Sequence, residues 1–174
     1  RAWGDTPAEA LENLRSVGES CSHCGLRAGK TKMVFGEGSV NSPVMFIGEA
    51  PGKDENLSGR PFVGRSGKLL RAMIQAVGLM DRCFIANIIK CRPPNNRPPE
   101  PEEIESCVKF LDKQIEIISP QLLVLLGRTA VKGLVPEHKA VPLDVLRAAS
   151  KEGSLFYKDI PALVTFHPSA LLRD

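Results

Sequence analysis

Four apolar runs alternate with amphipathic segments along this chain. The runs cover residues 44–47 (VMFI), 83–89 (CFIANII), 122–126 (LLVLL) and 162–166 (ALVTF). Short continuous apolar runs are typical of strands that are buried on both faces of a sheet. Strands that alternate with helices indicate a parallel sheet with helices on both sides. The pattern therefore predicts an α/β fold, a three-layer α/β/α sandwich around a central four-stranded, mostly parallel sheet.

Helical spacing marks the segments between these runs. Apolar residues recur on one face in residues 8–17, 68–77 and 102–118. A further helix is expected to start near Thr129, and the weak pattern of residues 136–158 predicts a loop-rich region. Residues 91–101 contain five prolines, so neither a helix nor a strand is expected there.

Polar loops follow the carboxyl ends of the predicted strands, which is the edge where open α/β folds bind ligands. The first of these loops, residues 48–67, reads GEAPGKDENLSGRPFVGRSG and has five glycines and two prolines. It does not match the phosphate-binding pattern G-x-x-x-x-G-K-[ST], because Leu69 follows Lys68 where a hydroxyl is needed. The loop offers instead the carboxylate of Glu49 and the ring of Phe62, which suits a flat, polar ligand stacked on an aromatic side chain.

Composition and charge restrict the picture only modestly. A chain of 174 residues is long enough for one domain with a substantial core, so residues 1–174 are predicted to form a single domain. Because the chain opens on Arg1 and stops at Asp174 directly after a dense motif, we expect both termini to be truncated. A net charge of +3 permits contact with nucleic acid without arguing for it. No apolar run approaches the roughly 18–20 residues that cross a bilayer.

The cysteines point to a metal site. Cys21 and Cys24 form a C-x-x-C pair, Cys91 and Cys107 follow later, and Cys83 is left over within a predicted strand. An odd number of cysteines without a secretory signal favours a reducing compartment, here the cytoplasm, over a disulfide framework. From the spacing alone, zinc and an iron–sulfur cluster are equally compatible with four cysteines.

Four motifs in the chain resemble those of the family 4 uracil-DNA glycosylases, the thermostable iron–sulfur type. They are the C-x-x-C pair, GEAPG-x-x-E-x-x-x-G-R-P-F-V-G in residues 48–64, NIIKCRPPNNR in residues 87–97, and FHPSALLR in residues 166–173. The resemblance implies an enzyme that flips uracil out of DNA and hydrolyses its N-glycosidic bond, leaving an abasic site. It also implies that uracil-containing DNA is the partner of a protein that is expected to be monomeric.

The resemblance implies a role for each motif residue. Phe62 is expected to stack on uracil, Asn87 to read its N3–H and O4 edge, and His167 to donate a hydrogen bond to O2. The uracil-binding residues are then Gly48, Glu49, Ala50, Phe62, Asn87 and His167. The catalytic candidates are Glu49, Glu55, Asn96 and His167. Because Ala50 occupies the position where family 1 enzymes carry an aspartate, the group that holds the attacking water stays open between Glu49, Glu55 and Asn96.

The resemblance also implies contacts outside the base pocket. Leu171 matches the position of an apolar wedge that fills the vacated base stack, although a plain helix-start leucine is equally compatible. Basic residues expected to bind phosphates are Lys90, Arg92, Arg97 and Arg173. Cys21, Cys24, Cys91 and Cys107 match the ligands of a structural [4Fe–4S] cluster. The segment between Cys91 and Cys107 has no histidine, so covalent trapping of uracil, known in one branch of the superfamily, is not expected.

Two other functions remain compatible with the chain. One is a non-catalytic DNA-binding relative that keeps the cluster, and the other is a metal-stabilised binding module that shares only the scaffold. Release of uracil from an oligonucleotide distinguishes them from the enzyme.

Overall fold

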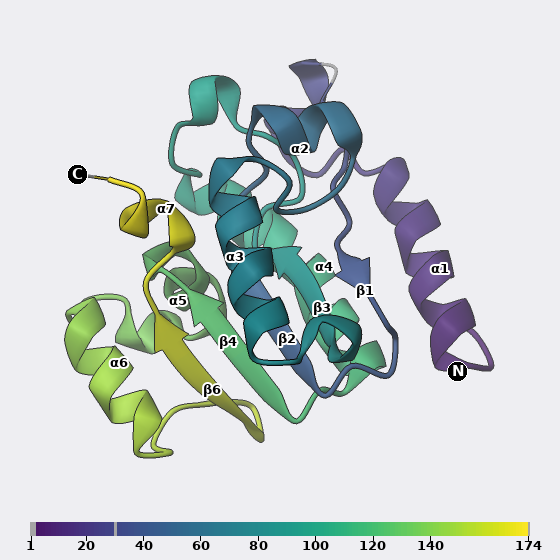
Figure 1. Ribbon diagram of the computed structural model, residues 1–174. Helices are drawn as coiled ribbons and strands as arrows, with labels where there is room; N and C mark the ends of the chain where they lie inside the picture. Colours follow the sequence, from purple (N-terminus) through teal and green to yellow (C-terminus); the bar gives the residue numbers. More distant parts are fainter. Residues whose placement is uncertain (1–2, 30, 174) are drawn as a thin grey trace.

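A mostly parallel sheet forms the centre of the protein (Figure 1). The computed structural model describes residues 3–29 and 31–173. Within them the strands lie in the order β1-β3-β2-β4-β6-β5. Their bounds are β1 (Glu37–Gly38), β2 (Val44–Gly48), β3 (Cys83–Asn87), β4 (Leu122–Leu126), β5 (Phe156–Tyr157) and β6 (Ile160–Thr165). The four inner strands are parallel to one another, which confirms the predicted parallel sheet.

The two outer strands, β1 and β5, were not predicted. Each has two residues and pairs antiparallel with its neighbour. A stretch of two residues is too short to show the alternation by which a strand is recognised in a sequence. The sheet therefore has six strands, with the predicted four at its centre.

Helices cover both faces of the sheet, as predicted (Figure 1). They are α1 (Pro7–Glu19), α2 (Lys53–Ser58), α3 (Arg65–Ala76), α4 (Pro101–Ile118), α5 (Arg128–Leu134), α6 (Leu143–Lys151) and α7 (Pro168–Leu171). Side chains from α1, α4, α5 and α6 belong to the core cluster on one face of the sheet, together with Met45 and Ile47 of β2. Leu70 and Ile74 of α3 pack against Val44 and Phe46 on the other face. No helix in the described part of the chain is long and apolar enough to cross a membrane.

Two helices lie where loops were predicted. α6 lies inside the segment 136–158, where a loop-rich region was predicted; it has nine residues and buries only Leu146 and Ser150. α2 lies within the glycine-rich loop and buries no residue at all. Its first turn is held by Glu55, whose carboxylate accepts a hydrogen bond from the Gly52 backbone N–H at 2.9 Å.

The register of the parallel strands brings their carboxyl ends to one edge. Gly48 at the end of β2 lies opposite Asn87 at the end of β3, and Leu126 of β4 lies opposite Thr165 of β6. The segments that follow these strands therefore meet at one edge of the sheet.

Candidate active site

A cavity of about 270 Å³ opens at this edge of the sheet. It is lined by residues that follow β2, β3 and β6 and by the proline-rich loop. They are Glu49, Ala50, Pro51, Gly52, Glu55, Phe62, Ser66, Asn87, Pro93, Asn96, Arg97, His167 and Ser169. All the predicted catalytic candidates lie in this set, as do the predicted uracil-binding residues except Gly48.

Gly48 contributes to the cavity through the atom that it lacks. A Cβ at this position would lie 2.5 Å from Cζ of Phe62 and 2.7 Å from Oδ1 of Asn87. The aromatic ring and the amide can approach each other only because residue 48 has no side chain. Gly48 thus determines how closely two neighbouring walls of the cavity meet.

Phe62 is held in an uncommon backbone conformation, with φ at +51°. The guanidinium of Arg71 donates to the carbonyls of Phe62 at 2.8 Å and Pro61 at 2.6 Å, which fixes the loop from below. The ring of Phe62 stacks with that of His167, their centroids 5.8 Å apart and their planes 30° apart. The ring is 5% exposed, so its position is determined by packing rather than by solvent.

Asn87 supplies a buried polar group that the protein leaves unpaired. Its side chain is 2% exposed, and Oδ1 has no hydrogen-bond partner among the described residues. Burying an acceptor without a partner costs about 1–3 kcal/mol, so such an atom calls for an explanation. Because Asn87 lines the cavity, a ligand with a polar edge is the natural partner for this amide.

His167 is held in one tautomer. The backbone N–H of Ser169 donates to Nδ1 at 3.2 Å, and the Ser169 hydroxyl lies 2.9 Å from the same nitrogen. Since Nδ1 accepts, the proton of the neutral ring sits on Nε2, which becomes a donor. Burial lowers the pKa of His167, and the positive charge of Arg173 lowers it further. The negative charge of Glu49 has the opposite effect and raises this pKa, but burial is the larger influence. The imidazole therefore stays neutral to lower pH than a free histidine does.

Glu49 lies directly after β2, and its carboxylate contacts a residue that the sequence did not single out. The hydroxyl of Thr129, at the start of α5, donates to Oε2 of Glu49. The two residues are 80 positions apart in the chain. Thr129 was recognised only as the expected start of a helix, and no motif marks it. Ser169 was quoted within a motif, but its effect on the tautomer needed the structure.

The comparisons with known proteins identify the family. Residues 35–174 match the Uracil DNA glycosylase superfamily. A type-4 uracil-DNA glycosylase of Sulfurisphaera tokodaii is 42% identical over 170 residues, which cover 95% of this chain and 77% of that protein. The chain is a type-4 member of this superfamily. The type-4 enzyme of Thermotoga maritima is 42% identical, with 97% of this chain and 86% of that protein covered, and that of Archaeoglobus fulgidus is 40% identical, with 94% and 84% covered.

The carboxylate of Glu55, a catalytic candidate in this type-4 chain, accepts hydrogen bonds from backbone N–H groups. Besides Gly52, it accepts hydrogen bonds from the N–H groups of Val63 at 2.8 Å and Gly64 at 2.7 Å. Three backbone donors leave its carboxylate little capacity for a water molecule. Glu55 joins the first turn of α2 to the segment that follows Phe62, and therefore helps to position that ring.

Asn96, the remaining candidate for holding water, is also engaged. Its Oδ1 accepts a hydrogen bond from Nε of Arg92 at 2.7 Å. Asn96 nevertheless lines the cavity, where it belongs to the proline-rich loop. Among these three candidates for holding water, Glu49 alone receives no hydrogen bond from the main chain or a cation within residues 3–29 and 31–173.

The predicted phosphate-binding residues differ in position. Lys90 is 2% exposed and donates to the carbonyl of Phe35 at 3.2 Å, so it does not lie at the mouth of the cavity. That prediction is corrected, because the side chain that follows β3 turns into the interior. Arg97 makes a bidentate contact with Glu103 at 2.8 and 2.9 Å. Arg92 reaches Asn96, and Arg173 is exposed.

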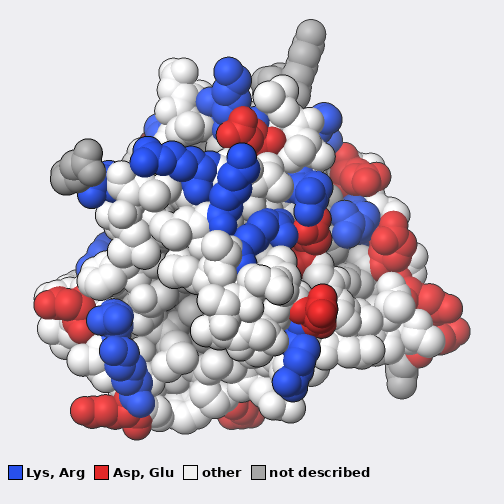
Figure 2. Space-filling model, viewed as in Figure 1, with Lys and Arg blue, Asp and Glu red and all other residues white. Residues whose placement is uncertain are grey.

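In Figure 2, Lys and Arg side chains gather on the upper half of the face viewed, with acidic side chains among them over α2, while many of the other acidic side chains lie toward the margins. Leu171 of α7 is 57% exposed. This distribution of charge is compatible with a phosphate backbone crossing the carboxyl edge of the sheet.

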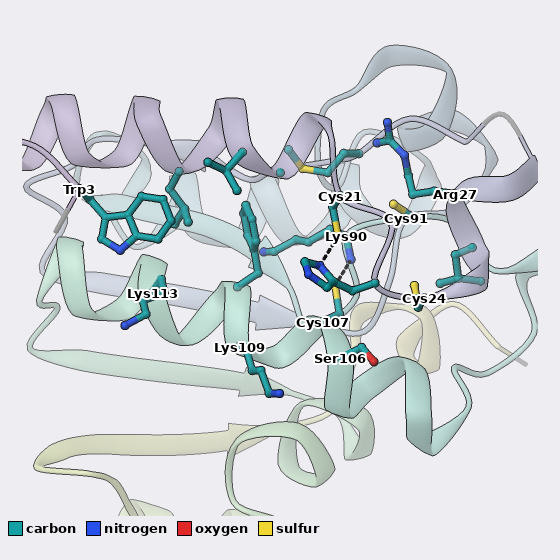
Figure 3. A pocket seen from close by; sticks show the side chains of 17 residues that line it. Trp3, Cys21, Cys24, Arg27, Lys90, Cys91, Ser106, Cys107, Lys109 and Lys113 are labelled. Atoms are coloured by element: carbon teal, nitrogen blue, oxygen red, sulfur yellow. Dashed lines mark hydrogen bonds between the residues drawn. The ribbon is translucent and has the colours of Figure 1, made fainter.

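The four predicted ligand cysteines line a second cavity, of about 390 Å³, between α1 and α4 (Figure 3). Cys21, Cys24, Cys91 and Cys107 lie at one end and Trp3 at the other. The backbone N–H of Lys90 donates to Sγ of Cys107 at 3.3 Å. Cys83, by contrast, is buried in β3 away from the other four and contacts the carbonyl of Met80.

The donor set at this end of the cavity is four cysteine thiols, a set that both zinc and iron–sulfur clusters use. As the side chains are placed in residues 3–29 and 31–173, no three His, Cys, Asp or Glu form a group that could hold a metal ion. Burial raises the pKa of Cys107 to about 11, and it also raises that of Cys91. Such thiols ionise when a metal coordinates them.

Proposed function

We infer that the protein excises uracil from DNA by hydrolysing the bond between the base and its deoxyribose. The observation that carries this inference is the buried, unpaired amide of Asn87 in a cavity that also contains the ring of Phe62 and the donor nitrogen of His167. Membership in the superfamily supports the same activity. The substrate is uracil-containing DNA, whose target base has to leave the stack before it reaches such a cavity.

The three side chains suit uracil at three places. The ring of Phe62 offers a face for stacking, and Asn87 offers one acceptor and one donor group to the N3–H and O4 edge. Cytosine presents the reverse order of donor and acceptor on that edge, so an amide held in one orientation rejects it. His167 offers its Nε2–H to O2, where negative charge develops as the glycosidic bond breaks.

Water completes the reaction at the sugar. Of the candidates, Glu49 is the one whose carboxylate is not taken up by the backbone or by an arginine. We assign it the role of orienting the attacking water and balancing the positive charge that develops on the sugar. Glu55 is assigned the positioning of the loop that carries Phe62, and Asn96 a place at the wall of the cavity.

We propose that Cys21, Cys24, Cys91 and Cys107 hold a [4Fe–4S] cluster. When bound, it supplies a covalent tie between the N-terminal segment, the proline-rich loop and α4, with no part in the chemistry of excision. Arg92, Arg173 and Leu171 are proposed to contact the DNA. The protein is proposed to act as a monomer in the cytoplasm.

A single-uracil oligonucleotide tests the proposed function. Purified protein with its iron content verified is incubated with single- and double-stranded substrates, and abasic sites are revealed by alkaline cleavage. We expect cleavage at uracil only, with matched thymine and cytosine oligonucleotides intact. If iron-loaded protein released no uracil from any of these substrates, the proposed function would be wrong.

The neutral state of His167 predicts how activity depends on pH. Because burial places the pKa of His167 below the usual 6.5, the excision rate is expected to stay constant from pH 8 to about 6.5 and to fall at lower pH. Protonation would turn Nδ1 into a donor that faces the N–H donor of Ser169, so the hydrogen bond between them would be lost. The measurement is a pH profile of single-turnover excision.

The same shift predicts the stability of a His167→Gln variant. Below pH 6.5 the unfolded chain binds a proton at His167 that the folded protein does not, so the wild-type protein loses stability relative to the variant as the pH falls. Denaturant unfolding at pH 7.5 and 5.5 measures the difference. Equal losses for both proteins would contradict the assignment of a neutral, partly buried imidazole.

A further inference from the structure

Thr129 lies beside the site without belonging to any motif. It stands in the first turn of α5, directly after β4, the strand between β2 and β6. Because β2 and β4 are parallel neighbours, the segments that follow them begin at the same edge of the sheet, which brings Thr129 next to Glu49. Its hydroxyl donates to Oε2 of Glu49, and both side chains are partly buried.

The hydroxyl of Thr129 is not needed for the helix that carries it. α5 is capped by Gly127, and no side chain accepts a hydrogen bond from its first turn. The neighbouring Arg128 turns away from the site and donates to the carbonyls of Lys139 and Val141, both at 2.9 Å. The contact with Glu49 is therefore the one hydrogen bond of the Thr129 side chain in the described part of the chain.

The contact leaves the second oxygen of Glu49 available. Among residues 3–29 and 31–173, no donor other than Thr129 reaches this carboxylate. The main chain of Glu49 is also fixed, since its carbonyl accepts the N–H of Ile89 at 3.0 Å. With its backbone and one oxygen held, the carboxylate has a defined orientation at the wall of the cavity, beside His167.

We propose that Thr129 is a positioning residue for uracil excision, which holds one oxygen of Glu49 so that the other receives the attacking water. The inference rests on the proposed function and on the role assigned there to Glu49. The water oxygen forms a bond to C1′ of the deoxyribose, and the bond from C1′ to N1 of uracil breaks with its electron pair remaining on the base. The proton of the water passes to the free oxygen of Glu49.

The fold explains why a threonine at this position can act on the reaction. Misplacing a reacting group by about 1 Å can cost about 100-fold in rate, so a carboxylate needs a second point of attachment. Gly127 has φ at +91°, which lets the chain turn sharply from β4 into α5. The turn passes close to His167, because a Cβ added at residue 127 would lie 3.1 Å from Cβ of His167. The turn therefore brings Thr129 close to Glu49, while Gly127 lies close to His167.

Three variants test the inference. Thr129→Val keeps the shape of the side chain and removes the hydroxyl, Thr129→Ser keeps the hydroxyl, and Glu49→Gln removes the charge. We expect Thr129→Val to lower the single-turnover excision rate by about 10- to 100-fold while the Kd for uracil-containing DNA changes less than about twofold. Thr129→Ser is expected to restore most of the rate.

The double variant separates positioning from a general structural role. If Thr129 acts through Glu49, then Thr129→Val lowers the rate no further in the Glu49→Gln background. The same loss in both backgrounds, or a wild-type rate in Thr129→Val, would overturn the inference while leaving the proposed function intact. A wild-type protein that releases no uracil in the same assay would overturn the proposed function instead, and the inference with it.

Discussion

Replacing Asn87 with leucine is expected to lower the single-turnover rate of uracil excision by about 10³-fold. Asn87 is the group to which the base-reading contacts are assigned, and leucine has nearly the same shape without a donor or an acceptor. A site built to hydrogen-bond its substrate loses the most when those groups are removed. The measurement is excision from a single-uracil oligonucleotide with enzyme in excess.

The same substitution is not expected to destabilise the protein. Oδ1 of Asn87 is buried without a partner, so the folded state bears the cost of desolvating it. Removing that acceptor is expected to leave the free energy of unfolding unchanged or to raise it by about 1 kcal/mol. Asn41, an exposed asparagine in the loop before β2, provides the control: Asn41→Ala should change neither quantity. A strongly destabilised Asn87→Leu would show that the amide serves the fold rather than a ligand.

Replacing Cys107 with serine is expected to remove the proposed cluster and to lower Tm by about 10 °C or more, the size of effect expected when several kcal/mol of folding free energy are lost. Cys107 lies on α4 and accepts the backbone N–H of Lys90, so this one position joins α4 to the segment between Asn87 and the proline-rich loop. Loss of the tie is expected to loosen Asn96 and to reduce excision as well. Iron content, visible absorption and thermal unfolding measure the loss independently of activity.

Cys83 is the matched control for this experiment. It is buried in β3 and does not line the cysteine cavity. Cys83→Ala should therefore retain iron and colour, with only the modest destabilisation of a shortened core side chain. If Cys107→Ser kept the iron content of the wild-type protein, the proposed ligand set would be wrong.

The central elements of the fold were predictable because each shows its burial in the sequence. The run LLVLL coincides with β4 (Leu122–Leu126), and the apolar positions of α4 repeat with helical spacing over five turns. The elements that were missed, α2, α6, β1 and β5, bury few or no residues. Strands of two residues and a helix of six offer too few positions to show a period, and α6 was missed because it is short and lies among turns and prolines.

The candidate site divides in the same way. Motif residues at or near the carboxyl ends of strands, such as Asn87 and His167, were predicted to meet because parallel strands end at one edge. Lys90 was predicted to lie at the mouth of the cavity because it follows Asn87 in the same motif. The motif does not show whether its ammonium group points to solvent or into the interior, where the structure places it. Glu55 was assigned to catalysis, although its carboxylate holds three backbone N–H groups.

The sequence by itself determined the four central strands, the helices α1, α3 and α4, and the family to which the chain belongs, and it singled out Glu49, Phe62, Asn87 and His167, which line the cavity. These depend on local spacing and on motifs that can be read without coordinates. Only the tertiary structure decided which atoms of those residues are free: Nε2 of His167 as the donor, Oδ1 of Asn87 without a partner, and one oxygen of Glu49 held by Thr129. The reason is physical, because hydrogen bonds between residues 80 positions apart depend on how the strands are placed beside one another.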